Sequence, residues 1–252
     1  MWFLNRKNIG LALGSGGAKG LAHIGVLKVL EEKGYNIKYI AGTSVGALIG
    51  GLYAFYKDAR KVESIILEQD LKSVIRALSD IDIKRRVIKG EKAKELINSY
   101  IGEVKVEDLD IKFVAVSVNV LTGEKVVINH GLLSDAILAS SSLPILFKPT
   151  ELNGSLLLDG GLVEPVPVRT AREMGSRKVL AVDLNTGQSV GEDFKVLLRS
   201  TDIMIQQLIK EQTKDAWRTI TPKFDGNVPL SKFLDGEDLI KKGEIEARRV
   251  LG

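Results

Sequence analysis

The sequence of 252 residues has no cysteine and only two histidines, His23 and His130. Disulfide bonds and thiolate metal sites are therefore excluded, and two histidines are too few for a typical zinc site. We expect no metal and no cofactor. The remaining composition, with 44% hydrophobic and 27% charged residues, is that of a folded globular chain rather than a disordered one.

We also expect no signal peptide, because the apolar residues 1–4 are too few and charged residues follow them. We therefore expect a cytoplasmic protein that could contact the inner face of the membrane peripherally. Residues 39–56 carry no charge and reach the length of a membrane span, but they include several glycines and divide into a strand and a helix. The length predicts a single domain, 1–252, with residues 57–110 as a peripheral helical cover and 186–252 as a mainly helical C-terminal part.

The net charge of +4 arises largely from one short segment, residues 84–94. Its only acidic residue is Glu91, and its basic residues are Lys84, Arg85, Arg86, Lys89, Lys92 and Lys94. Such a run is usual on a solvated loop and helix flank, and it would also suit contact with anionic lipid headgroups. Nucleic acid is a poorer partner, because no aromatic residues are interleaved with the basic ones.

Strands and helices alternate along the chain, which predicts an α/β fold: a three-layer sandwich around a mostly parallel central sheet. The expected strands are 8–13, 36–41, 111–119, 124–129, two short strands on either side of 153–154, and 178–183. The expected helices are 21–33, 45–56, 62–71, 91–101, 134–142 with Ser134 as its cap, 168–174, 193–217 and 237–251.

The stretch Gly42-Thr-Ser-Val-Gly46 lies between a buried apolar strand and an uncharged helix. Strand, tight turn and helix are the context of a G-x-S-x-G nucleophile elbow. In such a turn Gly42 and Gly46 leave room in the bend, while Ser44 projects its hydroxyl beyond the sheet edge. The alternative is a glycine-rich packing turn without a chemical role.

A second glycine-rich loop, Gly14-Ser-Gly-Gly-Ala-Lys-Gly20, follows the first predicted strand. A phosphate-binding P-loop would need a serine or threonine after a Gly-Lys pair, and a dinucleotide loop would need glycine where Lys19 stands. The third interpretation is an oxyanion hole, in which the N–H groups of Gly16 and Gly17 face the oxygen that becomes negative when a serine attacks a carbonyl.

A serine nucleophile needs a base within hydrogen-bond reach. His23 falls inside the first helix, where packing is the better interpretation, and His130 falls in a turn. No histidine follows Asp159, so the usual α/β-hydrolase order of serine, acid and histidine is not available. Asp159 ends a predicted strand before Gly160 and Gly161, which allow close approach of another backbone. It is either the base or an ordinary turn aspartate.

Four motifs in order resemble the bacterial patatin-like phospholipases over residues 8–185. They are Gly14 to Gly20 with Leu-Ala-His-Ile-Gly25, the elbow from Gly42 to Gly46, Ala139-Ser-Ser-Ser-Leu-Pro144 with Phe147 and Pro149, and Leu158-Asp-Gly-Gly161 with Pro165 and Pro167. The resemblance implies lipid acyl hydrolysis without calcium or a catalytic histidine. It implies Ser44 as nucleophile, Asp159 as base, Gly16 and Gly17 as oxyanion donors, and Gly14, Gly20, Gly42, Gly46, Gly160 and Gly161 as supporting residues.

Three points remain open at this stage. Ser15 stands where the family commonly has glycine, so its amide could be inside or outside the oxyanion hole. An aspartate of ordinary pKa is a weak base, so burial should raise the pKa of Asp159. Leu143, Ile145, Leu146 and Phe147 could line an acyl pocket or belong to the core.

The expected partner is a lipid or other acyl ester. The alternative functions are a general carboxylesterase or thioesterase, or a catalytically silent lipid-binding module.

Overall fold

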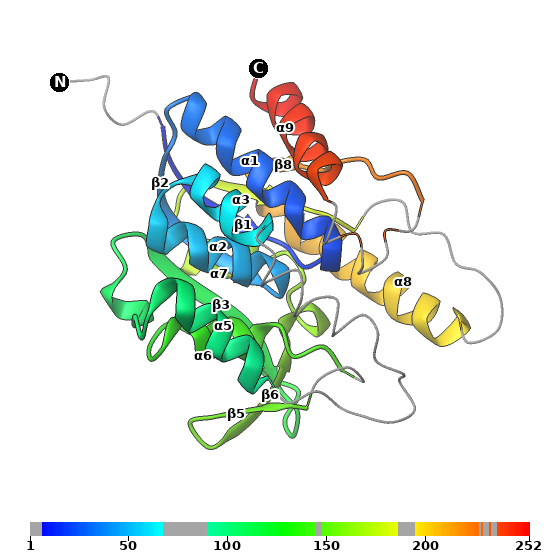
Figure 1. Ribbon diagram of the computed structural model, residues 1–252. Coiled ribbons are helices and arrows are strands. Elements are labelled where there is room, and N and C mark those ends of the chain that lie inside the picture. The colour runs from blue at the N-terminus through cyan, green and yellow to red at the C-terminus, as the bar shows by residue number, and fades with distance from the viewer. Residues whose placement is uncertain are drawn as a thin grey trace.

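A central sheet of eight strands organises the computed structural model, which describes residues 7–67, 90–144, 148–185, 195–226, 228, 232 and 236–252 (Figure 1). The strand order is β5-β6-β3-β2-β1-β7-β8, with β4 also paired to β3. The strands are β1 Asn8–Leu13, β2 Asn36–Thr43, β3 Lys112–Asn119, β4 Lys125–Ile128, β5 Thr150–Leu152, β6 Ser155–Asp159, β7 Val179–Val182 and β8 Arg218–Ile220.

Five neighbouring strands of the sheet are parallel, in the order β3, β2, β1, β7 and β8. Strands β4, β5 and β6 are added in antiparallel pairs. Parallel strands put all their carboxyl ends at one edge, so the loops that leave β1, β2 and β7 meet there. The predicted α/β fold with a mostly parallel central sheet is confirmed.

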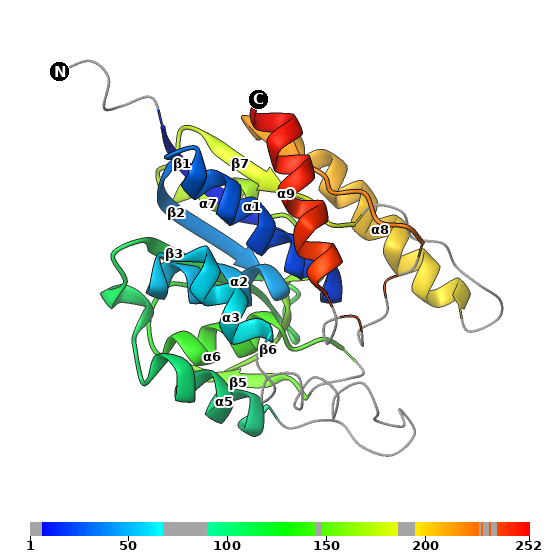
Figure 2. The ribbon, with the colours of Figure 1, turned by 45° about the horizontal axis from the view of Figure 1, so that its top comes forward.

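Helices cover both faces of the sheet (Figures 1 and 2). They are α1 Leu21–Glu32, α2 Val45–Tyr56, α3 Ala59–Leu67, α5 Glu91–Ile101, α6 Leu133–Ser140, α7 Val168–Glu173, α8 Lys195–Gln212 and α9 Glu237–Leu251. One apolar core lies between the sheet and the side with α1, α2, α3, α5, α6 and α9. A smaller core lies on the opposite face, beneath α7 and α8.

The smaller core is thin because small side chains line the sheet there. Ala12 on β1 is paired with Ala41 on β2 and with Ala181 on β7, which makes a row of alanines across three strands. Alternate residues of β1, Leu11 and Leu13, point into the larger core on the other face. The row of alanines lets the short helix α7 pack closely on β1, β2 and β7.

Most predicted elements form within a few residues of their expected bounds, and β1, α2, α5 and α9 match them. The predicted cap of α6 is wrong, because the helix begins at Leu133. Ser134 is its second residue, and the side chain of Ser134 is buried. Backbone contacts from elsewhere fix this start: Leu133 N–H donates to Val104 O, and Leu132 forms a bridge with Lys105.

The predicted helix 193–217 is too long at its C-terminal end. Helix α8 ends at Gln212, and Arg218–Ile220, which follows the predicted helix, pairs with β7 as the edge strand β8. Three residues carry too little pattern to predict a strand, so pairing with β7 decides their conformation. Residues 68–71 of the predicted helix 62–71 lie outside the described residues.

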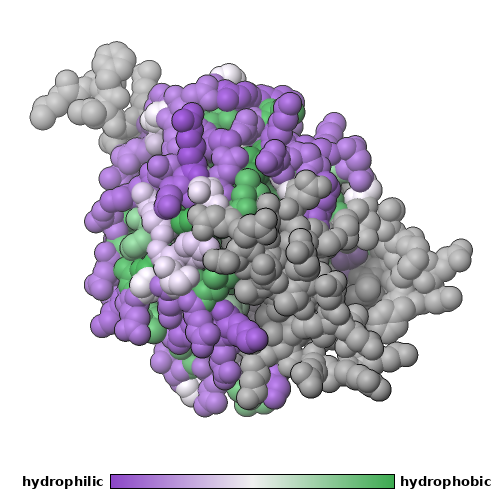
Figure 3. Space-filling view, in the orientation of Figure 1, coloured by the Kyte–Doolittle hydropathy of each residue, from purple (hydrophilic) through white to green (hydrophobic). Residues whose placement is uncertain are grey.

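No described helix is long and apolar enough to cross a membrane, and residues 39–56 divide between β2 and α2 as expected. Hydrophilic residues dominate the described surface in the orientation of Figure 3, where apolar residues occur in small patches between them.

Candidate active site

Ser44 occupies the sharp turn between β2 and α2. Its backbone angles, φ 58° and ψ −126°, are strained for a residue with a side chain, and the residue is buried. The turn is so tight that a Cβ on Gly46 would lie 2.0 Å from Leu13 O, and one on Gly42 would lie 2.5 Å from Gly46 O. Both positions therefore require glycine, and the strand, turn and helix of a nucleophile elbow are present.

The last residue of α6 and the residues just after it hold the backbone on both sides of the site. Ser44 N–H donates to Ser140 Oγ at 2.9 Å, and Ser140 Oγ donates in turn to Val116 O at 2.6 Å. Two residues later, Ser142 O accepts from Asp159 N–H at 3.0 Å. Sequence reasoning included this segment in a motif but missed its role, because no local pattern shows which backbone a buried hydroxyl will contact.

The pairing of β3 with two other strands brings Ser44 and Asp159 together. Thr43, the last residue of β2, pairs with Val116, and Asp159, the last residue of β6, pairs with Ser117. The ends of β2 and β6 thus lie at consecutive positions along β3. Asp159 Oδ1 accepts from Gly161 N–H at 2.7 Å, while Oδ2 is buried with no hydrogen-bond partner in the described part of the chain.

Burial raises the pKa of Asp159 from 3.8 to about 6. The Ser44 hydroxyl and the Gly161 amide, which interact with the carboxylate, act in the opposite direction and lower the pKa. Burial has the larger effect because it removes water from the charged form of a residue that is only 2% exposed. The carboxylate can therefore exchange a proton near neutral pH.

The loop after β1 offers free amides at the same edge of the sheet. Among the described residues, no acceptor takes a hydrogen bond from Gly16 N–H or Gly17 N–H. Gly17 has φ 55°, and no described atom lies within 4 Å of the position of a Cβ there. Ser15 differs, because its N–H donates to Pro165 O at 2.8 Å. The Ser15 amide is thus used inside the fold and does not add to the free pair.

Close backbone approach joins this loop to the elbow and to the strand end at Asp159. A Cβ on Gly20 would lie 2.0 Å from Val45 Cγ2, and one on Gly160 would lie 2.2 Å from Val116 O. A Cβ on Gly14 would lie 2.7 Å from Val182 O, and one on Gly161 would lie 3.0 Å from Asp159 Oδ1. Glycine at these four positions lets the three segments converge on one site.

His23 supports the glycine-rich loop from inside the core. It is fully buried, and its Nε2 lies 2.8 Å from Gly14 O. Burial lowers the pKa of His23 to about 4. The hydrogen bond to Gly14 acts in the opposite direction, but its effect on the pKa is smaller. A neutral imidazole that donates from Nε2 to this carbonyl satisfies the contact. His23 is a packed residue, as the sequence analysis favoured.

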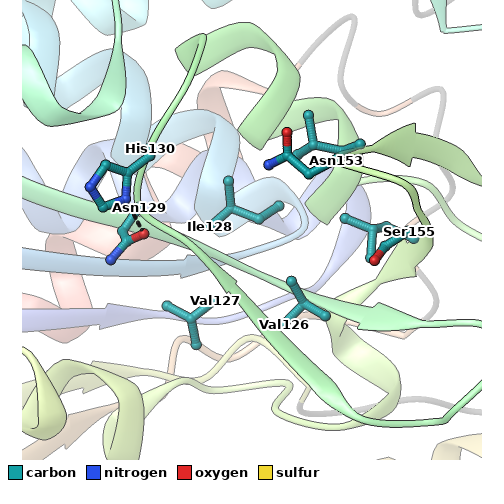
Figure 4. Close-up of a pocket in the computed structure, with 9 residues that line it drawn as sticks. Val126, Val127, Ile128, Asn129, His130, Asn153 and Ser155 are labelled. Carbon is teal, nitrogen blue, oxygen red and sulfur yellow. Dashed lines mark hydrogen bonds between the residues drawn. The ribbon is translucent and has the colours of Figure 1, made fainter.

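His130 lies away from Ser44. It is exposed, its Nδ1 is 2.6 Å from Asn129 Oδ1, and it borders a groove of about 200 Å³ between β4 and the hairpin of β5 and β6 (Figure 4). Neither Ser44 nor Asp159 lines this groove. Strand β4 runs antiparallel to β3 and pairs Ile128 with Ala115, so the chain that continues to His130 leads away from Val116.

Several other predictions concern residues that lie partly or wholly outside the described chain. Ile145, Leu146 and Phe147 lie outside the described residues, and Leu143 is half-buried. Most of the basic segment, residues 84–89, also lies outside them, while Lys94 forms an ion pair with Asp135. Within the described ranges, no three or more His, Asp or Glu side chains are grouped as metal ligands would be.

A family model for patatin-like phospholipases matches residues 11–172. The chain belongs to this family. The matched region begins in β1 and ends in α7, so it contains the glycine-rich loop, the elbow and Asp159. Strands β7 and β8 and helices α8 and α9 lie beyond it.

Relatives of the patatin-like region occur in bacteria and fungi. An NTE family protein of Mycobacterium tuberculosis is 36% identical over 183 residues, which are 72% of this chain and 50% of that protein. Lysophospholipase NTE1 of Candida glabrata is 36% identical over 186 residues, 73% of this chain and 11% of that protein. This chain therefore matches half or less of the length of these relatives.

The fold also resembles a solved structure. The crystal structure of VipD from Legionella pneumophila aligns with 97% of this chain and 66% of that chain, with a TM-score of 0.58 and 14% sequence identity. At this identity the likeness concerns the arrangement of helices and strands alone.

Proposed function

We propose that this patatin-like chain hydrolyses carboxylic esters of lipids, in the manner of a phospholipase or lysophospholipase. The observation that carries the proposal is the buried pair of Ser44 and Asp159, in which a strained serine lies beside a carboxylate whose pKa is raised to about 6. The patatin-like family and the fungal lysophospholipase relative support the lipid substrate class.

The proposed reaction is acyl transfer through a covalent intermediate. Ser44 Oγ attacks the ester carbonyl carbon while the Asp159 carboxylate takes the hydroxyl proton. The N–H groups of Gly16 and Gly17 donate to the oxygen that becomes negative. When the ester C–O bond breaks, Asp159 returns the proton to the leaving alcohol. Water then attacks the acyl-serine, Asp159 takes its proton and passes it to Ser44 Oγ, and the fatty acid leaves.

Helix α2 adds a further stabilising field. Ser44 immediately precedes the first turn of this helix, whose N-terminal amides carry the positive end of the helix dipole. A tetrahedral oxyanion formed on Ser44 would therefore lie close to that positive end and to the glycine-rich loop. Both contributions grow as charge develops, which favours the transition state over the neutral substrate.

A fluorophosphonate probe tests the proposed nucleophile. The wild-type chain should be labelled and should release fatty acid from lysophospholipid, and Ser44→Ala should do neither. Ser99→Ala is a matched control, because Ser99 lies on the exposed side of α5. Equal labelling of wild type and Ser44→Ala would exclude Ser44 as the nucleophile.

A series of substrates tests the class of ester. We expect hydrolysis to increase with acyl-chain length from short p-nitrophenyl esters to lysophospholipids. Preference for short chains or thioesters would favour a general carboxylesterase or thioesterase instead. Lipid binding without release of fatty acid from any ester would favour a silent lipid-binding module. A cytoplasmic location and contact of residues 84–94 with an anionic membrane belong to the proposal.

A further inference from the structure

Three apolar side chains are exposed together at the end of the β3 and β4 hairpin. Leu121 is 80% exposed, Val120 is 41% exposed, and Leu156 on the neighbouring β6 is 38% exposed. Val120 N–H donates to Leu156 O at 2.9 Å, so these residues are adjacent across the two strands. We call Val120, Leu121 and Leu156 the hairpin tip.

The fold does not need the Leu121 side chain. Asn119 fixes the turn, because its Oδ1 accepts from Leu121 N–H at 2.9 Å and from Thr122 N–H at 3.3 Å. The backbone closes the same turn through Gly123 N–H and Asn119 O, 2.9 Å apart. A polar residue at position 121 would keep all of these bonds, so the exposed leucine contributes nothing to the turn itself.

The hairpin tip projects beyond the sheet edge that carries Ser44. Thr43 pairs with Val116, and β3 continues past that level to Asn119 before the tip begins. Four further residues of extended chain correspond to about 13 Å at roughly 3.3 Å per residue. A flat surface that approached from the carboxyl edge would therefore meet the tip before it reached Ser44.

Near the tip, the helices of the described chain pack against one face of the sheet and leave the other face without a helix. Val118 pairs with Leu158 on this face, and Val120 and Leu156 share it two residues further on, whereas Ser117 and Asp159 point to the other face. Helix α7 packs on β1, β2 and β7, and α6 packs against β5 and β6 from the side of Asp159. The exposed side chains of the tip are thus available to an external partner.

We propose that the hairpin tip inserts into the surface of a zwitterionic phospholipid layer and places Ser44 next to its lipid substrate. The inference rests on the proposed lipid hydrolysis, because phospholipid substrates lie in such a layer. The acidic residues beside the tip, Glu124 and Glu151, would not attract an anionic surface, and Lys125 is held by Glu164 at 2.9 Å. The attraction is therefore apolar.

Binding to phosphatidylcholine vesicles tests the tip without any measurement of hydrolysis. Leu121→Ser should weaken vesicle binding about tenfold, equivalent to about 1.4 kcal/mol. The loss should be the same at low and high salt, because apolar insertion is not screened by ions. Ile245→Ser is the control: Ile245 is 57% exposed on α9, which Figures 1 and 2 place far from β5 and β6. It should bind as wild type does.

The absence of cysteine allows a direct second measurement. An environment-sensitive fluorophore on Leu121→Cys should shift its emission to shorter wavelength when phosphatidylcholine vesicles are added, and the same fluorophore on Ile245→Cys should not. This fluorescence measurement needs only a folded, labelled chain.

Unchanged vesicle binding of Leu121→Ser would overturn the proposal, and so would an unshifted fluorophore at position 121. Wild-type binding to phosphatidylserine vesicles without any binding to phosphatidylcholine vesicles would also overturn it, because the hairpin tip would then not insert into a zwitterionic layer. The proposed hydrolysis fails separately, through absence of fatty acid release by a wild-type chain that still binds through the tip.

Discussion

At the scale of single residues, Asp159 determines how activity should depend on pH. Only its ionised form can take a proton from Ser44, and burial raises its pKa to about 6. We expect kcat/KM for a soluble ester to rise with pH through about 6 and then level off. Asp159→Asn should lower the rate by several orders of magnitude and remove this dependence, as pH profiles of both proteins would show.

The histidines supply the control for this prediction. His130→Ala should keep the wild-type profile, because His130 is exposed and lies away from Ser44. A profile governed by His130, together with near-normal turnover of folded Asp159→Asn, would contradict the proposed dyad. His23→Ala is less informative, since His23 is buried against Gly14 O and its loss should reduce stability.

The raised pKa of Asp159 also makes the free energy of unfolding depend on pH. Because the pKa of Asp159 is about 6 when folded and near 3.8 when unfolded, the folded state holds the proton more tightly. The free energy of unfolding therefore falls as pH rises from about 3.8 to 6, by up to about 3 kcal/mol. Asp159→Asn should be more stable than wild type above pH 6, and the difference in Tm should vanish below pH 4.

At the scale of elements, the contact of α1 with α9 sets a strict limit on side-chain size. A Cβ on Gly243 would lie 2.0 Å from Ala22 O, and one on Gly25 would lie 2.0 Å from Ile240 O. The two helices therefore touch backbone to backbone, and α9 closes the larger core at its outer side. Neither glycine could be replaced without a shift of one helix.

Gly243→Ala should lower the free energy of unfolding by about 2 kcal/mol, because the added methyl group pushes α9 away from α1. The direction of the change in the free energy of unfolding is informative, because replacing glycine by alanine in an unobstructed helix stabilises it by up to about 1 kcal/mol. Thermal unfolding measures the effect, with Lys241→Ala on the exposed side of α9 as the control. An unchanged or raised Tm for Gly243→Ala would contradict the close contact.

At the scale of the whole molecule, the net charge of +4 is concentrated in residues 84–94. If this segment meets anionic lipid, changing Arg85, Arg86 and Lys89 to Gln should weaken binding to phosphatidylserine vesicles and flatten its salt dependence. Hydrolysis of a soluble ester should not change. Lys94 is less able to contribute, because it pairs with Asp135.

A second triple variant separates local charge from net charge. Changing three exposed lysines elsewhere to Gln alters the net charge equally, and suitable positions are Lys38, Lys105 and Lys210. Equal weakening by both triple variants would mean that only the total charge matters. Unchanged binding of the first variant at low salt would leave residues 84–94 as a solvated surface.

The local parts of this protein could be predicted from its sequence. Glycines at 42 and 46 around Ser44, between an apolar strand and an uncharged helix, indicate the elbow because few other residues fit so tight a turn. The glycine-rich loop, the strand end at Asp159 and the alternation of elements could be predicted in the same way. Each depends on residues that are neighbours in the chain, so their spacing is visible without a structure.

How these parts meet depends on strand pairing between distant segments of the chain. Ser44 and Asp159 become neighbours because β2 and β6 pair with consecutive residues of β3, and no local pattern encodes that register. The same pairing buries the carboxylate, which raises its pKa, and brings Ser140 to the Ser44 amide. Edge strand β8 escaped prediction for a related reason: hydrogen bonds between distant segments, rather than local preference, fix its conformation.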